Sequence, residues 1–272
     1  MEAAFYPLLA IIFLGVPHGA ADGVFAARAK LVASPQDRMF FYGVYLATAA
    51  AVIYAWLSFP SLGLGVFLAL SVTHFGLGDA RAYPGYPNPL LRALLHGGAV
   101  IFLIPAFHVE TVSYVFSVLG GSNVYWVEHF LTALGFLWAG AGLFYLIVYP
   151  VRRVAYALPL LEIAGLAMCF YLLPPLWGFA VYFCLVHSPR HFRRLFRDFG
   201  GVDKSVGDII QIITLSAFVI TAILVAAQML PDLDYTNNLV RSVFIGLAAL
   251  TVPHMVLVDG LPLLQPKRNK VS

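Results

Sequence analysis

Residues 206–228 read VGDIIQIITLSAFVITAILVAAQ, and Asp208 is the one charged residue among them. A helix that crosses the hydrocarbon core of a bilayer needs about 20 mostly apolar residues, and this stretch meets that requirement. The rest of the chain is similar: of 272 residues, 61% are hydrophobic and 11% are charged. Ordinary soluble domains carry about 25% charged residues. A soluble protein of this size could not bury so much apolar surface, so we expect an all-α, polytopic transmembrane helical bundle.

Apolar runs separated by charged residues, proline and glycine predict about nine transmembrane helices. Residues 109–122 are expected to form an interfacial helix on the outer surface. The first apolar run is too long for a cleavable signal peptide, so residues 1–272 are interpreted as a single integral-membrane domain. The nine spans are predicted at residues 3–28, 39–58, 61–80, 90–108, 124–149, 152–173, 175–196, 206–228 and 239–263.

The basic residues indicate how this bundle is oriented. Of the 16 lysines and arginines, 15 fall on the side reached after odd-numbered helices, and Arg241 lies on the other side. Lysine and arginine accumulate in cytoplasmic loops of membrane proteins. We therefore expect the N-terminus outside the cell and the C-terminus in the cytoplasm.

Five histidines occur in four short strings within the predicted spans. These strings lie on the first, third, seventh and ninth helices, which run in the same direction. Each histidine follows the start of its helix by about 12–16 residues, which places it about 18–24 Å into the membrane. Because ionisable residues within spans usually face the bundle interior, the five are predicted to share one layer in the cytoplasmic half. The strings are GVPHGAAD (His18), THFGLGD (His74), VHSPRHFRR (His187 and His191) and TVPHMVLVD (His254).

Four of these histidines are predicted to bind a metal ion. His187 and His191 are four residues apart and share one helix face. Imidazole is a ligand for Zn, Cu, Fe and Ni, and His18 and His74 at the same depth would complete a four-ligand site. His254 is predicted to support this site, although it could also be a ligand or line a substrate pocket.

Carboxylates accompany the histidines. Asp22 follows His18 by four residues, and Asp79 and Asp259 each follow a histidine by five. Ligating histidines commonly donate their second N–H to a carboxylate, so these aspartates are expected to orient the imidazoles. Asp79, next to Arg81, could equally be a solvated helix end. Glu162 lies in the middle of the sixth span, where it is expected to be protonated or bonded to a site histidine.

In this order, and across almost the whole chain, the four strings resemble the Brp/Blh family of membrane β-carotene 15,15′-dioxygenases. The resemblance implies Fe(II)-dependent cleavage of the central double bond of β-carotene by O₂ to two molecules of all-trans-retinal. It implies that the catalytic iron is held by His18, His74, His187 and His191. One departure is that many members follow the first aspartate with a polar residue, often histidine, where this chain has Gly23.

The resemblance also bears on location and partners. We expect a multi-pass protein of a prokaryotic inner membrane, in contact with the lipid bilayer and not with nucleic acid. A retinal-binding rhodopsin is a possible recipient of the product.

Three other functions fit parts of the pattern. Another membrane non-haem iron oxygenase or desaturase would be expected to carry more paired histidines than the one HxxxH here. A bis-histidine haem protein would use two of the five positions. A metal or proton transporter could also use intramembrane His, Asp and Glu, but it would need a polar path across both membrane halves.

Overall fold

The computed structural model describes residues 2–81, 88–150, 152–198, 206–230 and 233–260, and within these ranges the chain is helical with no β-strand. Four short segments, labelled η, have π-helical hydrogen bonding. In chain order the elements are α1 (Glu2–Ala10), η1 (Ile11–Gly15), α2 (Pro17–Ala20), α3 (Asp22–Arg28), α4 (Pro35–Ser58), α5 (Pro60–Ala80), α6 (Pro89–Gly98), η2 (Ala99–Leu103), α7 (Ile104–Phe107), α8 (Val109–Gly120), α9 (Tyr125–Val148), α10 (Val154–Leu172), α11 (Pro175–Val181), η3 (Tyr182–His187), α12 (Ser188–Asp198), α13 (Val206–Met229), α14 (Tyr235–Met255) and η4 (Val256–Gly260).

Among the described residues, seven helical runs are long and apolar enough to cross a membrane. The predicted sixth and seventh spans are also helical, as α10 and as the continuous run α11–η3–α12. The apolar part of α10, Tyr156–Leu172, is short, and α12 carries four arginines. Seven segments rather than nine therefore satisfy length and composition. They are Ala4–Arg28, Pro35–Ser58, Pro60–Ala80, Pro89–Phe107, Tyr125–Val148, Val206–Met229 and Tyr235–Gly260.

Local chemistry explains why α4 begins earlier than residue 39. The Ser34 hydroxyl accepts a hydrogen bond from the Asp37 backbone N–H at 3.1 Å, and the Asp37 carboxylate accepts one from the Ser34 N–H at 2.9 Å. This reciprocal capping box satisfies two otherwise unpaired donors at a helix start. Pro35 then occupies the first turn, where a missing N–H costs nothing. The charged turn therefore belongs to the helix and not to the preceding loop.

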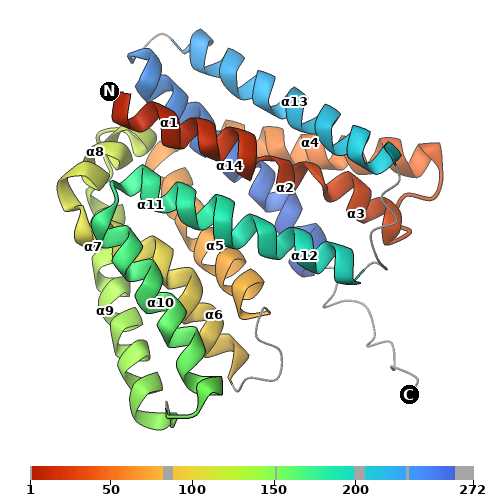
Figure 1. Ribbon diagram of the computed structural model, residues 1–272. Coiled ribbons are helices and arrows are strands. Elements are labelled where there is room, and N and C mark those ends of the chain that lie inside the picture. Colours follow the sequence, from red (N-terminus) through yellow and green to blue (C-terminus); the bar gives the residue numbers. More distant parts are fainter. Residues whose placement is uncertain (1, 82–87, 151, 199–205, 231–232, 261–272) are drawn as a thin grey trace, which may run out of the picture.

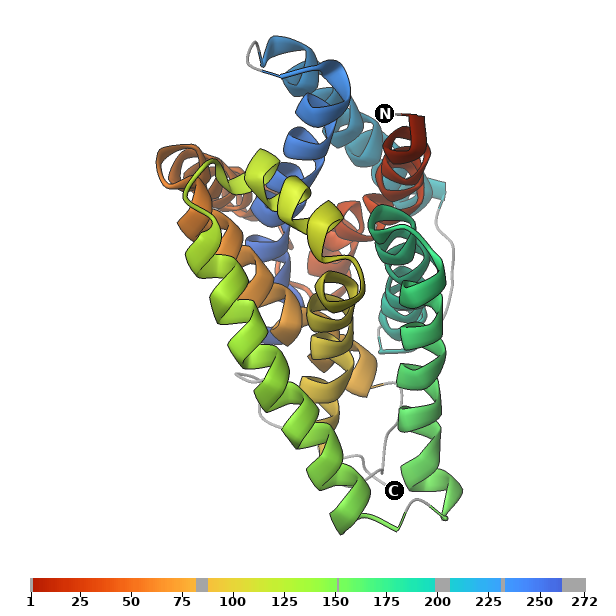
Figure 2. The ribbon, with the colours of Figure 1, turned by 90° about the vertical axis from the view of Figure 1, so that its left-hand side faces the viewer.

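The bundle has two sides that meet at α5 and α14. Figure 1 shows α13 and α4 along one edge of the molecule and α9 along the opposite edge. In Figure 2, α6 lies between α9 and α10, and α6 contacts both. Helices α5 and α6 approach so closely that a methyl group on Gly76 would overlap the carbonyl oxygen of Ala93. Small residues permit such backbone contact between membrane helices.

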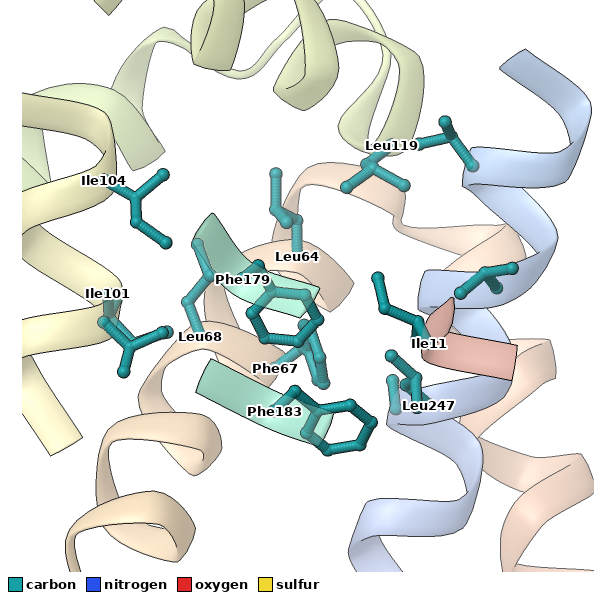
Figure 3. Packing of buried hydrophobic residues seen from close by; sticks show 14 of the residues in the cluster. Ile11, Leu64, Phe67, Leu68, Ile101, Ile104, Leu119, Phe179, Phe183 and Leu247 are labelled. Carbon is teal, nitrogen blue, oxygen red and sulfur yellow. The ribbon is translucent and has the colours of Figure 1, made fainter. Parts of the chain in front are cut away.

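An aromatic and aliphatic core fills the space between the two sides. Figure 3 shows Phe67, Phe179 and Phe183 gathered at its centre, with aliphatic side chains from α5, η2, α7, α8 and α14 around them. The rings of Phe179 and Phe183 stack with centroids 5.4 Å apart and planes 10° apart. Phe183 also contacts the ring of His18 at 5.1 Å, so the histidine layer lies directly against this core.

Three of the four π-helical segments lie beside the histidines. The Val16 N–H donates to the Ile11 carbonyl at 3.0 Å, a five-residue spacing, immediately before Pro17 and His18. His187 is the last residue of η3, and Asp259 lies in η4. π-helical turns are rare and frequently occur at functional sites. The irregular backbone therefore points to the same layer of the bundle as the predicted histidines.

Candidate metal centre

The structure brings His18, His74, His187, His191 and His254 into one cluster, from α2, α5, η3, α12 and α14. All five are buried. The His74 and His187 ring centroids are 4.9 Å apart, and those of His191 and His254 are 4.8 Å apart. His18 lies between these pairs, 5.6 Å from His187 and 5.4 Å from both His191 and His254.

Three of the five rings share one arrangement of their nitrogen atoms. His18 Nδ1 lies 2.5 Å from the Gly15 carbonyl oxygen, and His254 Nδ1 lies 2.7 Å from an Asp22 carboxylate oxygen. His74 Nδ1 lies 3.2 Å from an Asp259 carboxylate oxygen. Carbonyl and ionised carboxylate oxygens only accept hydrogen bonds, so Nδ1 is the protonated nitrogen in each ring. The lone pair is then on Nε2, which is the nitrogen free to bind a metal.

The Gly15 carbonyl is available to His18 because the helix is irregular there. In a regular α-helix this oxygen would accept the N–H of Gly19. That N–H instead donates to Val16 at 3.1 Å. The η1 turn and Pro17 therefore provide a main-chain acceptor that fixes the His18 ring.

The Nε2 atoms have the environment expected of metal ligands. Those of His74 and His187 face each other at 3.2 Å. Those of His191 and His254 are buried without a hydrogen-bond partner among the described residues. Two groups could hold an ion, His18–His74–His187 and Asp22–His191–His254, each with all donor atoms within 4.8 Å. Several imidazole nitrogens and one carboxylate suit a transition metal better than Mg²⁺ or Ca²⁺.

The carboxylates pair with histidines distant in sequence, which corrects the expected local pairing. Asp22 contacts His254 and not His18, because the Gly15 carbonyl already occupies Nδ1 of His18. Asp259 contacts His74. Asp79 approaches Nδ1 of His187 to 3.8 Å, too long for a direct hydrogen bond. Each aspartate thus connects two separate helices.

A second donor holds each of these carboxylates. The Tyr45 hydroxyl donates to Asp22 at 2.9 Å, and the Tyr182 hydroxyl donates to Asp79 at 2.7 Å. Arg81 bonds to Asp259. Nothing in the spacing of the tyrosines predicts their contacts, since these join residues 23 and 103 positions apart.

Asp79 is 0% exposed, so the alternative that it is a solvated helix end is wrong. Its neighbour Arg81 forms an ion pair with Asp259 inside the bundle. Arg190 lies 3.5 Å from Asp79. A buried carboxylate close to an arginine and a tyrosine is the arrangement that keeps a charge tolerable inside a membrane protein.

Glu162 lies beside the cluster on α10. Its carboxylate accepts a 2.5 Å hydrogen bond from Arg190 on α12, and its other oxygen lies 4.0 Å from Nε2 of His96. The ion pair with Arg190 accounts for a charge in the middle of this helix. Since Arg190 also approaches Asp79, Glu162 is connected to the histidine layer through an arginine.

His254 has the features expected of a metal ligand. It is 2% exposed, its Nδ1 contacts a carboxylate, and its Nε2 is buried without a hydrogen-bond partner. The sequence placed it at the right depth but offered no pair motif. Its ring contacts His18, His74 and His191, so it lies within the cluster and not behind it.

An apolar chamber of about 30 Å³ adjoins the cluster. Three histidines form part of its wall, and the remainder is chiefly aromatic and aliphatic. A space of this size admits a small molecule of one or two heavy atoms beside the imidazoles. The chamber is lined by Val16, His18, Gly19, Phe67, Ser71, His74, Phe75, Phe179, Phe183, Leu247, Leu250, Thr251 and His254.

Comparison with known proteins identifies the family of this chain. Residues 9–262 match the model of a protein family described as beta-carotene 15,15′-dioxygenase. This chain belongs to that family. A beta-carotene 15,15′-dioxygenase from an uncultured marine bacterium is 31% identical over 264 residues, covering 93% of this chain and 91% of the relative. A probable beta-carotene 15,15′-dioxygenase from Halobacterium salinarum is 26% identical over 299 residues, covering 97% and 86%.

The family predicted from the histidine strings is therefore confirmed, and all four strings fall inside the matched range. No solved structure matches this chain. The dioxygenase relatives imply a metal cofactor, and the histidine and aspartate groups are able to bind one.

Proposed function

We propose that this protein cleaves the central 15,15′ double bond of β-carotene with O₂ to give two molecules of all-trans-retinal. The proposal assigns Fe(II) to His18, His74, His187 and His191, with His254 beside them. One observation carries it: in a member of this family, five imidazoles meet within the helical bundle, and three of them form part of the wall of an apolar chamber.

The protein's part in the reaction is to hold the reactants and exclude water. A bound ferrous ion would activate O₂ for reaction with the alkene, and the alkene itself would supply the four electrons that reduce O₂. Asp22 and Asp259 retain the Nδ1 protons, so the Nε2 lone pairs stay available. Phe75 and Phe183 close the chamber around the double bond. Both oxygen atoms end in the two aldehydes, so no general acid or base is required.

The surroundings of the cluster favour oxygenation over ion transport. A transporter would need polar groups that continue from the cluster through the other membrane half. On that side the described residues next to the histidines are the phenylalanines and aliphatic side chains of the core (Figure 3). An apolar wall accommodates a hydrocarbon substrate. It obstructs a hydrated ion, because it offers no groups that could replace the water around the ion.

We also propose nine spans, with α10 and α11–η3–α12 as the sixth and seventh, the N-terminus outside and the C-terminus cytoplasmic. His187 Nε2 lies 3.2 Å from His74 Nε2, so α11–η3–α12 reaches the same depth as α5. The basic residues support this orientation. Residues 1–272 would form one domain in a prokaryotic inner membrane, and a retinal-binding rhodopsin is proposed to receive the product.

Expression in bacteria that accumulate β-carotene tests the function. We expect retinal in cell extracts by chromatography, and iron in the purified protein by elemental analysis. His187→Ala should abolish both, whereas His129→Ala, which removes an exposed histidine on α9, should preserve both. Bound iron without retinal would refute the substrate, and full activity of His187→Ala would refute the site.

A further inference from the structure

Two larger cavities adjoin the chamber beside the histidines. On one side the chamber shares the wall residues Gly19 and Leu250 with a cavity of about 400 Å³ between α4 and α13, which we call the α4–α13 arm. On the other side it shares Phe67, Ser71, Phe75 and Phe179 with a linking cavity of about 80 Å³. A third cavity adjoins the linking cavity.

The third cavity, which we call the α8–α9 arm, has about 390 Å³. It shares Ile101, Pro105, Val112 and Phe116 with the linking cavity. The two arms lie toward opposite edges of the bundle, where Figure 1 shows α13 and α9. The chamber with the histidines therefore lies between the two arms, directly beside the α4–α13 arm and separated from the α8–α9 arm by the linking cavity.

Both arms have mainly apolar walls. Phe41, Leu46 and Phe218 line the α4–α13 arm, and Phe102, Phe136 and Trp138 line the α8–α9 arm. The one carboxylate in the second wall, Glu128, accepts a 2.5 Å hydrogen bond from Ser113. Ligand sites of this kind bind hydrocarbons through burial of apolar surface.

The proportions of the cavities match one class of ligand. The arms are nearly equal, about 400 and about 390 Å³, and each is much larger than the chamber between them. A rod with two identical bulky ends and a thin polyene centre has this distribution of volume. A further cavity of about 180 Å³ shares Phe67 with the chamber, but it is less than half the volume of either arm.

We propose that these cavities form one carotenoid-binding tunnel, in which each arm holds one end ring and the chamber holds the central double bond. This inference rests on the proposed function and extends it. Because the arms have nearly equal volumes, each would hold one end ring of a symmetric substrate, and the positions of the rings would determine which bond lies beside the histidines. The walls, and not the metal, would then select the 15,15′ bond.

Gly19 controls the passage into the α4–α13 arm. It lines both the arm and the chamber, and a Cβ built on it would meet no atom within 4 Å. A side chain at this position would therefore enter the tunnel without displacing protein atoms near its Cβ. Gly43 on α4 also has no atom within 4 Å, but it is exposed and lines neither arm.

Gly135 has the same role in the α8–α9 arm. It lines that arm, and a Cβ on it would lie 3.9 Å from Phe102, an ordinary contact. Gly140 on the same helix is exposed and has no atom within 4 Å of a Cβ. Each arm thus offers one glycine inside the tunnel and one matched glycine outside it.

The experiment compares Gly19→Leu with Gly43→Leu, and Gly135→Leu with Gly140→Leu, in bacteria that accumulate β-carotene. Carotenoid that co-purifies with chelator-treated protein is measured by visible absorbance. Retinal is measured in cell extracts, and iron in protein purified without chelator. We expect both tunnel variants to lose carotenoid and to form about 100-fold less retinal, because a misplaced double bond cannot react. Iron should stay at the wild-type level, and both outside variants should behave as wild type.

A shorter apocarotenoid, with one ring and a truncated second end, distinguishes the two arms. Its truncated end leaves part of one arm empty, so Gly135→Leu should cleave it better than β-carotene relative to wild type. Gly19→Leu blocks the passage next to the chamber and should impair both substrates. If Gly19→Leu loses iron, Leu250→Phe narrows the same passage from α14 and takes its place.

The outcomes separate the tunnel from the proposed function. If wild type and both tunnel variants form retinal at equal rates, the tunnel proposal is refuted and the proposed function still holds. Absence of retinal from wild type would overturn the function. In that case carotenoid retained by wild type but not by Gly19→Leu would still support the tunnel, and its absence from both would overturn it.

Discussion

Helices α13 and α14 are neighbours of similar length, and they use their apolar residues in opposite ways. The α13 span has the higher mean hydropathy, 2.5 against 1.7, yet 11% of its window is buried against 56% for the span that contains α14. The larger apolar content of α13 therefore faces lipid. The mean hydropathy of α14 is lower because this helix carries polar residues such as Ser242 and His254 into the interior. The span with the highest mean hydropathy therefore contributes no histidine to the cluster.

The strongest test of this contrast removes one polar side chain from each helix. His254→Ala on α14 should lower retinal formation about 100-fold and reduce bound iron, because it removes an imidazole from the cluster. Ser216→Ala on α13 removes a buried hydroxyl without a described partner and should change both little. Retinal and iron per mole of purified protein are measured. Equal effects would show that the two helices do not differ in function.

The second test concerns packing. Leu239 on α14 is 0% exposed, and Ile213 on α13 is 62% exposed. Leu239→Ala should lower the free energy of unfolding by about 2–5 kcal/mol, through lost burial and a residual cavity. Ile213→Ala should change it by no more than about 0.5 kcal/mol. Thermal unfolding in detergent gives both values, and a large loss from Ile213→Ala would mean that α13 packs against protein at that position.

The third test sharpens how α14 is connected to the site. A double-mutant cycle of Asp22→Asn with His254→Gln should give a coupling of about 1 kcal/mol, since their side chains share a 2.7 Å contact. The cycle of Asp22→Asn with His18→Gln should couple by less than about 0.5 kcal/mol. Unfolding of the metal-free protein is the measurement. A larger coupling energy for the His18 cycle than for the His254 cycle would show that Asp22 pairs with His18, as their proximity in sequence suggests.

The smallest expected effect concerns the attachment of α13. Arg28 on α3 and Asp208 at the start of α13 form a 2.7 Å ion pair, with side chains 21% and 29% exposed. Partly exposed pairs contribute little, so Arg28→Gln should cost about 0.5 kcal/mol. Most of that cost should vanish at high salt, because screening weakens the pair in the wild type. A salt-independent loss of several kcal/mol would mean that α13 depends on this contact.

The sequence predicted the helices because the signal is local. A run of about 20 apolar residues identifies a span wherever it occurs, and depth within the bilayer follows from the rise per residue. That is why His18, His74 and His187 could be placed in one layer from their distances to the helix starts. The role of the four histidines as iron ligands is still a prediction.

The partners of the aspartates could not be predicted in the same way. Asp22 reaches His254, 232 residues away, because α3 and α14 are neighbours in the bundle. Helix adjacency depends on packing between distant segments and has no local signature. The partner of Glu162 could not be predicted either. That partner, Arg190, lies on a later helix and is one of four arginines there.

The π-helical turns have a consequence for how the site can change by insertion and deletion. A π-turn holds one residue more than the α-turn it replaces, so it accommodates an extra residue while the helix on either side keeps its direction. Deleting one residue from 182–186 would let η3 relax to an α-turn, and α12 would keep nearly its present orientation. A deletion between His187 and His191, where the helix is regular, would instead rotate His191 by about 100° away from His18 and His254. The same change of length is therefore tolerated in η3 and disables the centre in α12.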